Sequence, residues 1–187
     1  MVDYLEKIPN PSKTGINQGL TSPSAAYMES ILGEPRESYT GECQEPDNPS
    51  FKALITTRKV GPIKATGLSA ALSSLDSIFS DVKNELPDLY ALIGNAGMLC
   101  CRYKRIKGKV VKQPSNHSWG TAIDIKLGGV LDTQGDGKTL RGLMILAHYF
   151  NAHGWYWGAS FPTEDAMHFE VARETLAKWS QAGLFSS

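Results

Sequence analysis

Four side chains in the second half of the sequence are of the types that bind a metal ion and accept a proton from water. His117 and Asp124 lie seven residues apart, and a second cluster adds His168 and Asp165. Two histidines and one aspartate form a three-ligand set for zinc, which leaves the fourth tetrahedral position open to water, as in catalytic sites. Asp165, three residues before His168, could accept the proton of the attacking water. The pattern predicts one catalytic Zn²⁺ held by His117, Asp124 and His168.

The elements that must position these residues follow from hydrophobic periodicity. Residues 121–127 alternate between apolar and polar types, which predicts a half-buried strand that carries Asp124. Apolar residues at helical spacing predict one helix from Leu68 to Val82, ending before Pro87, and another from Leu140 to Phe150, stopping at Gly154. We further expect an aromatic strand or loop at 155–158 and a last helix over 173–182. This order predicts an α+β domain, with a small antiparallel sheet and flanking helices.

Three intervening stretches are irregular in pattern. Residues 89–93 and 98–103 are short apolar runs, and the glycines of 94–97 between them predict a hairpin or tight bend. Residues 104–112 are rich in Lys and Arg around a glycine, and we interpret them as a solvated loop, with contact to an anionic polymer as the alternative. Residues 131–138 superficially suggest a calcium loop, but the ligand order and closing Glu are missing, so we expect a turn.

The N-terminal third is expected to be a lead-in to the catalytic core. Residues 1–64 are rich in Pro, Ser, Gly and Asn, with one credible helix that Ser22 could cap, that Ala25–Leu32 would form, and that Gly33 would stop. We expect this segment to wrap the core formed by residues 65–187, with an adaptor or targeting role as the alternative. At 187 residues the chain suits one well-cored domain.

Composition limits the kinds of binding partner that the protein can have. Lys plus Arg and Asp plus Glu are 19 each, so no net field recruits nucleic acid or an anionic membrane. The N-terminus lacks the apolar core of a signal peptide, and no apolar run is long enough to span a membrane. We therefore expect synthesis in the cytoplasm, without membrane insertion. Three cysteines do not form a disulfide framework, and Cys43 could pair with Cys100 or Cys101 only in an exported protein.

The order of residues around the candidate ligands resembles a known family. The matching positions are Ser115, His117, Gly120, Ala122 and Asp124, in the SxHxxGxAxD pattern of the zinc peptidases of bacterial cell-wall peptides. Trp157-Gly158 followed by residues 165–170 resembles the WGG…DxxHFE segment of its endopeptidase branch. The family includes D-alanyl-D-alanine carboxypeptidases and L-alanyl-D-glutamate endopeptidases, phage endolysins among them. The resemblance covers about residues 65–175 and implies a Hedgehog/DD-peptidase-like fold.

The resemblance also implies roles for individual residues. Arg102 would bind a substrate carboxylate or stabilise the developing oxyanion, although a salt bridge within the core is an alternative and Arg105 is a rival for the role. Asp165 would be the general base, with Glu164 as its rival.

Three further residues are expected near the site. Ser115 would fix the loop or donate to substrate, and Trp119 would pack over the site. Glu170 would share the face of a strand with His168 and orient it, or else be a surface carboxylate. His148 and His153 fall in neither motif and are interpreted as ordinary helix and cap residues.

The predicted function is hydrolysis of peptidoglycan stem peptides, preferably as an L-alanyl-D-glutamate endopeptidase and alternatively as a D-alanyl-D-alanine carboxypeptidase. A zinc-stabilised module that binds the wall or a protein without cutting is the alternative of a different class. A cytoplasmic product would need release by phage lysis, or delivery by a secretion system as an antibacterial effector, to reach the cell wall or periplasm. An immunity protein or a secretion adaptor would then be a further partner.

Overall fold

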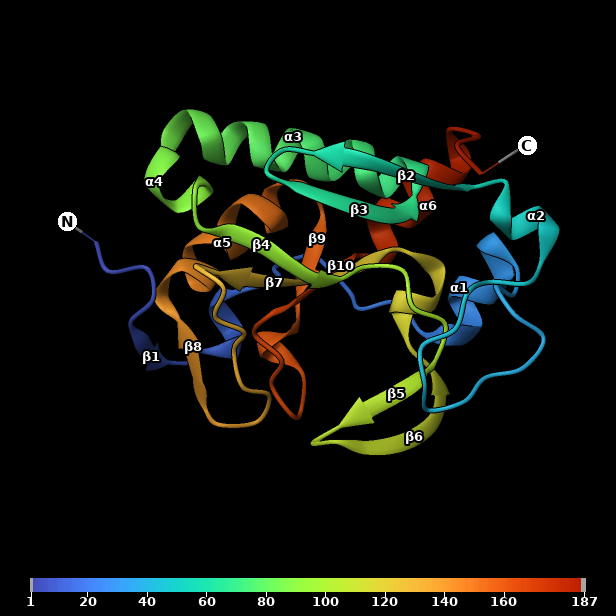
Figure 1. The fold of residues 1–187 in the computed structure, drawn as a ribbon, viewed down its shortest axis with the longest axis horizontal. Helices are drawn as coiled ribbons and strands as arrows, with labels where there is room; N and C mark the ends of the chain where they lie inside the picture. The colour runs from blue at the N-terminus through green and yellow to red at the C-terminus, as the bar shows by residue number, and fades with distance from the viewer. Residues whose placement is uncertain (1, 186–187) are drawn as a thin grey trace.

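A four-stranded antiparallel sheet lies at the centre of the computed structural model, which describes residues 2–185 (Figure 1). Its strand order is β4-β7-β10-β9. The strands are β4 (Ile93–Gly97), β7 (Ala122–Leu127), β10 (His168–Val171) and β9 (Trp155–Trp157). The predicted strand over 121–127 is therefore β7, and the aromatic run is β9. The mixture of helices and small antiparallel sheets makes this an α+β fold, as predicted.

The core lies between this sheet and two helices. On β7, Ile123, Ile125 and Leu127 are fully buried, because alternate side chains of a strand point to the same face. Helix α5 (Arg141–Ala152) packs on β7 and β9, and its Phe150 stacks on Phe169 of β10 with ring centroids 4.1 Å apart. The opposite face of β7 is left to carry polar side chains, Asp124 among them.

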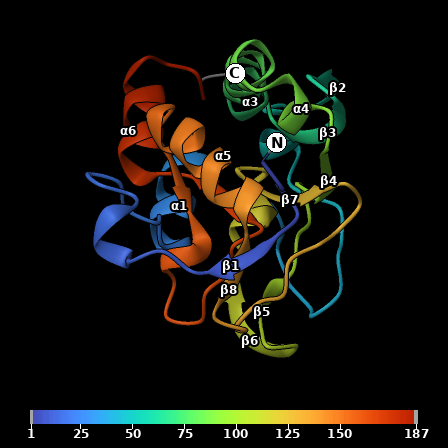
Figure 2. The same cartoon turned by 90° about the vertical axis from the view of Figure 1, so that its left-hand side faces the viewer.

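The long helix α3 (Ser69–Glu85) forms the outer layer of this core. Its apolar stripe is buried against α5 and against the hairpin of β2 (Ile55–Val60) and β3 (Ile63–Leu68). It ends before Pro87, as predicted, because proline lacks the amide donor of a continuing helix. Helix α6 (Arg173–Gln181) is the last helix of the described residues, and its Leu176 is buried. Figure 2 shows α5 and α6 on one side of the molecule and the β2–β3 hairpin with α3 on the other.

The N-terminal segment is tied to the core at several points. Strand β1 (Lys7–Pro9) pairs with β8 (Lys138–Leu140), and the Asn17 side chain donates to the Trp157 carbonyl at 2.9 Å. The expected boundary after residue 64 falls inside the β2–β3 hairpin. Other local elements are η1 (Lys13–Gly15), α1 (Ala25–Leu32), α2 (Pro49–Lys52) and η3 (Gly158–Ser160).

The start of α1 corrects one prediction. Ser24, not Ser22, caps the helix by accepting a hydrogen bond from the Tyr27 amide. The cap lies two positions closer to the helix than Ser22, and this leaves the Ser22 hydroxyl free for another partner. Gly33 ends the helix with φ 73°, as expected of a glycine cap.

Residues 87–114 differ most from their prediction. Residues 94–97 are not a bend but part of β4, because pairing with β7 overrides the turn preference of glycine and asparagine, and the glycines mark a bulge at Asn95/Gly97. The preceding run, 89–93, spans the end of helix α4 (Pro87–Tyr90), a turn and the first residue of β4, while 98–102 is not a regular strand. The basic stretch is a hairpin of β5 (Tyr103–Ile106) and β6 (Lys109–Pro114), not a loop.

The cysteines and the loop before β8 complete the fold. Cys43 and Cys100 form a disulfide, with Cα atoms 5.1 Å apart, and Cys101 is a buried free thiol. In the turn at 131–138, the buried Asp132 lies 3.6 Å from the ammonium of Lys7, so a lysine faces this carboxylate. Among residues 2–185, no helix is long and apolar enough to cross a membrane.

Candidate metal centre

Three elements bring His117, Asp124 and His168 together. His117 lies on the short 3-10 helix η2 (Asn116–Trp119), Asp124 on β7 and His168 at the start of β10. The antiparallel register places His168 directly opposite Asp124. Directly opposed residues point to the same face of a sheet, so the register alone brings these two side chains into contact. Helix η2 delivers the third from the segment just before β7.

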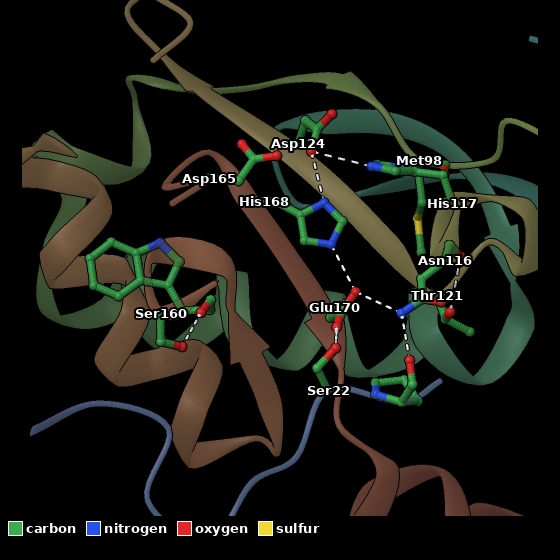
Figure 3. A network of polar contacts seen from close by, with 12 residues as sticks. Ser22, Met98, Asn116, His117, Thr121, Asp124, Ser160, Asp165, His168 and Glu170 are labelled. Carbon is green, nitrogen blue, oxygen red and sulfur yellow. Dashed lines mark hydrogen bonds and ion pairs between the residues drawn. The ribbon is translucent and has the colours of Figure 1, made fainter. Parts of the chain in front are cut away.

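The distances among the three side chains fit a zinc ion. Asp124 Oδ1 lies 3.3 Å from His117 Nε2 and 3.2 Å from His168 Nδ1. With zinc bonds of about 2.0–2.1 Å, two ligand atoms of a tetrahedron lie about 3.3 Å apart. These are the only three His, Cys, Asp or Glu side chains of residues 2–185 whose ligand atoms cluster in this way. Figure 3 shows the Asp124 carboxylate facing both imidazoles.

The outward nitrogen of each imidazole has its own acceptor. His117 Nδ1 lies 2.9 Å from the Met98 carbonyl, which can only accept, so Nδ1 carries the proton and Nε2 is free for a metal. His168 Nε2 lies 2.9 Å from Glu170 Oε2, which leaves Nδ1 for the metal. Partners of this kind fix the tautomer and orientation of metal-binding histidines. The donor set and its supports thus fit zinc, with opposite ring nitrogens used by the two histidines.

Glu170 is held in turn by two further donors. It is buried and accepts hydrogen bonds from Ser22 Oγ and from Asn116 Nδ2 at 2.8 Å, as well as from His168 (Figure 3). The same Asn116 amide donates to the Pro23 carbonyl at 3.1 Å. Glu170 is therefore not a surface carboxylate, and the structure places it in contact with His168. The N-terminal segment, through Ser22 and Pro23, takes part in this support.

The electrostatics of the metal-free site are those of a charged cluster. Burial raises the pKa of Asp124 and of Glu170, but contact with the histidines outweighs it, so both pKa values lie below their ordinary range. For His168, burial lowers the pKa, but hydrogen bonds to Asp124 and Glu170 raise it to about 10. Without a metal, His168 therefore carries a proton that a metal must displace.

The three side chains open into a cavity of about 330 Å³. Its walls come from η2, the β5–β6 hairpin, the loop before β8 and the segment after β9. The lining residues discussed below are Ser22, Arg102, Lys104, Arg105, Ile106, Ser115, Gln134, Asp165 and Glu170. A volume at the lower end of the usual ligand range, about 300–1,000 Å³, suits a short part of a substrate.

Asp165 lies in this cavity beside Asp124 and His168 (Figure 3). Its Oδ2 accepts a hydrogen bond of 2.9 Å from Gln134 Nε2, while its buried Oδ1 has no partner among the described residues. Burial raises the pKa of Asp165 above the ordinary value, and Gln134 partly opposes that shift. The rival Glu164 does not line the cavity, because its carboxylate accepts from the Gly137 amide. Of the two carboxylates, only Asp165 is placed to meet a substrate.

The remaining predicted residues divide between cavity and core. Arg102 lines the cavity; burial lowers the pKa of its guanidinium, while Asp124 and Asp165 oppose the shift. Arg105 also borders it, but its guanidinium donates to the Gly41 carbonyl and pairs with Glu42 at 2.8 Å. Ser115 is buried and lines the cavity.

Two further sets of residues lie away from the cavity. The prediction that Trp119 packs over the site is wrong: it is fully buried, and its Nε1 donates to the Gly33 carbonyl at 2.9 Å, so it joins η2 to the end of α1. His153 bonds Asp81 at 2.7 Å, and His148 is exposed on α5, so neither meets the metal ligands.

A buried His-Asp-His set with a carboxylate in the same cavity defines a candidate metal-dependent hydrolase. A family model described as D-alanyl-D-alanine carboxypeptidase matches residues 109–171, which is less than half of the chain but contains all three candidate ligands and Asp165. The match supports a peptidase of the zinc-dependent family that acts on cell-wall peptides. Neither the comparison with curated proteins nor that with solved structures found a match.

Sequence reasoning missed three residues of the site. Gln134 lies in a stretch interpreted only as a turn, Ser22 was interpreted as a helix cap, and Asn116 was passed over beside His117. Each makes its contact with a residue at least 31 positions away. Local patterns carry no signal for such contacts. The position of Asn116 inside the motif was the one available hint.

Proposed function

We propose that this protein is a zinc-dependent peptidase that cleaves bacterial peptidoglycan stem peptides, on a Hedgehog/DD-peptidase-like fold. The observation that carries the proposal is the contact of one Asp124 oxygen with both His117 and His168 at 3.2–3.3 Å, inside a cavity that also holds Asp165. A structural zinc site would be closed by a fourth protein ligand, and no further His, Cys, Asp or Glu of the described residues joins this group.

The chain's own residues supply the proton transfers and hold the substrate. A bound zinc would activate water at neutral pH and polarise the scissile carbonyl. Asp165 would accept the proton of the attacking water and return it to the departing amine, and its raised pKa brings it closer to the working pH of such a group. Arg102 would donate charged hydrogen bonds to a substrate carboxylate or to the oxygen on which charge develops.

We prefer an L-alanyl-D-glutamate endopeptidase because the aspartate at position 165, in the order DxxH, resembles that branch. A D-alanyl-D-alanine carboxypeptidase is the second candidate. It is supported by the description of the matching family model and by Arg102, which could hold the terminal carboxylate that such a substrate presents. The two candidates share the metal and Asp165, and they differ in the bond cut.

The test is mass spectrometry of peptidoglycan fragments after incubation with the zinc-loaded protein. New L-alanyl and D-glutamate ends would identify the endopeptidase, and loss of terminal D-alanine the carboxypeptidase. Asp165→Asn should bind zinc and lose about 10²–10⁴-fold in turnover, because general acid–base catalysis contributes that much.

Glu164→Gln is the matched control. It removes a neighbouring carboxylate outside the cavity but keeps an acceptor for the Gly137 amide, so activity should stay near wild type. Equal losses in the two variants would contradict the role of Asp165. A zinc-loaded, folded wild type that cuts neither bond would overturn the proposed function.

A further inference from the structure

The β5–β6 hairpin concentrates positive charge beside the cavity. Five of the nine residues from 104 to 112 are Lys or Arg and none is acidic, although the whole chain has a formal net charge of 0. Only Arg105 among them forms an ion pair within the described residues, with Glu42. The hairpin projects from the body of the protein in both views of the fold (Figures 1 and 2). The lysines thus remain available to a negatively charged ligand.

Register divides the hairpin into two faces. Lys104 is opposite Val111, and Ile106 is opposite Lys109, so these four side chains share one face, which we call the basic face. Lys104 and Ile106 line the catalytic cavity, so the basic face continues its wall. Ile106 and Val111 are 41% and 38% exposed, which leaves apolar surface between the two ammonium groups.

Contacts at both ends fix the position of the hairpin. At its base, the Tyr103 amide donates to the Thr40 carbonyl at 2.7 Å. At its tip, the Lys107 amide donates to Gln134 Oε1 at 2.8 Å, and the same Gln134 donates to Asp165. The basic face is therefore held at a set distance from the catalytic carboxylate. A ligand on it would lose little binding energy to ordering of the hairpin.

We propose that the basic face is an extended binding subsite, which holds a carboxylate-bearing stretch of the polymeric substrate adjoining the peptide in the cavity. The inference rests on the proposed function. A cavity of about 330 Å³ holds only part of a polymer, so the next part must lie along a neighbouring wall. Lys104 and Lys109 complement its carboxylates, and Ile106 and Val111 contact its alkyl groups.

The experiment compares polymer and short substrate. The variant Lys109→Gln, whose lysine lies on the basic face but outside the cavity lining, is assayed on teichoic-acid-free sacculi and on a synthetic stem peptide. We expect the half-saturating amount of sacculi to rise about three- to fivefold at low salt, since one exposed ion pair contributes little. Cleavage of the short peptide should stay within about twofold. The difference should shrink in about 0.5 M salt, where exposed charges are screened.

The matched control is Lys112→Gln, which removes the same charge from the other face of the hairpin. It should behave as wild type on both substrates. An equal loss in the control would show a general charge effect and overturn the proposal. A loss of the same size on the short peptide would also overturn it, because Lys109 would then act on the peptide in the cavity.

Binding without turnover separates this inference from the proposed function. Zinc-loaded Asp165→Asn should co-sediment with sacculi. Adding both Lys104→Gln and Lys109→Gln, or amidating the sacculus carboxylates, should weaken that binding about tenfold. If the wild type cleaves nothing but this lysine-dependent binding to sacculi is observed, the proposed peptidase activity is refuted and the proposed subsite is retained. Lysine-dependent binding only to walls that retain phosphate polymers, or only to anionic vesicles, would refute the subsite.

Discussion

Loss of the Ser22 hydroxyl should weaken zinc binding, although Ser22 is not a ligand. Ser22 donates to the buried carboxylate of Glu170, which in turn accepts from His168 Nε2 at 2.9 Å. In Ser22→Ala, Glu170 keeps only Asn116 and His168 as donors. The orientation of His168 then depends on a less constrained carboxylate. The effect on the metal is therefore indirect and passes through one hydrogen-bonded chain.

Two magnitudes can be worked out for this substitution. A hydrogen bond to a charged group contributes about 1.5–3 kcal/mol, so the free energy of unfolding should fall by about that amount. Loss of a partner that orients a metal ligand lowers metal affinity about 10–100-fold, which corresponds to about 1.4–2.8 kcal/mol. The first estimate concerns unfolding of the metal-free protein and the second concerns zinc binding, so each needs its own measurement.

The assay is a competition titration with a chromogenic zinc chelator, paired with urea unfolding of the metal-free protein. Ser24→Ala is the matched control, because Ser24 caps α1 and touches no residue of the site. It should cost about 1 kcal/mol of stability and leave zinc affinity unchanged. Equal zinc affinities in the two variants would refute the argument that Ser22 acts through Glu170.

Three further predictions concern Asp165, the metal-free cluster and a motif glycine. Gln134→Ala should move the acidic limb of the kcat/KM profile to higher pH without loss of zinc, because Gln134 stabilises the ionised Asp165; an unmoved limb would exclude Asp165 as the titrating group. In metal-free protein, the raised pKa of His168 should stabilise the fold. This contribution is complete below about pH 6.5 and is lost as the pH rises through about 10. Zinc-loaded protein should not show this loss, and thermal unfolding with and without a chelator measures both cases. Gly120→Ala should lower the free energy of unfolding by more than the roughly 1–2 kcal/mol of left-handed strain, because the new Cβ would meet Gly67 Cα at 2.7 Å. Gly129→Ala is the control, because its Cβ would have open space and only the strain should remain. Equal urea midpoints for the two variants would contradict the clash.

The parts of the fold predicted from sequence are those whose pattern is local. The apolar stripe of α3, the alternation of β7 and the stops at Pro87 and Gly154 each depend on a few neighbouring residues. The class of the sheet followed from these patterns, whereas the three clustered candidate ligands followed from residue type and from the spacing of the two motifs. In contrast, β4 was predicted as a bend, because its glycines favour turns and only its pairing with β7 makes it a strand.

The support of the candidate site is long-range and could not be predicted in the same way. Gln134 reaches Asp165 across 31 residues, and Ser22 reaches Glu170 across 148. Neither residue type is unusual for its loop, so no local pattern marks it. The turn at 131–138 therefore has two roles. Its backbone changes direction, and the Gln134 side chain joins Asp165 to the tip of the β5–β6 hairpin.

The spacing of the second motif has a direct physical meaning. Residues two apart on a strand point to one face, so His168 and Glu170 of β10 meet while Phe169 between them enters the core. Glu170 thereby takes Nε2 of His168 and leaves Nδ1 toward Asp124. His117, on a 3-10 turn, has the reverse assignment, because the Met98 carbonyl takes its Nδ1. The two histidines thus approach one carboxylate oxygen from different elements and through different ring nitrogens. A pair of strands and one short 3-10 turn are therefore enough to build the three-ligand set.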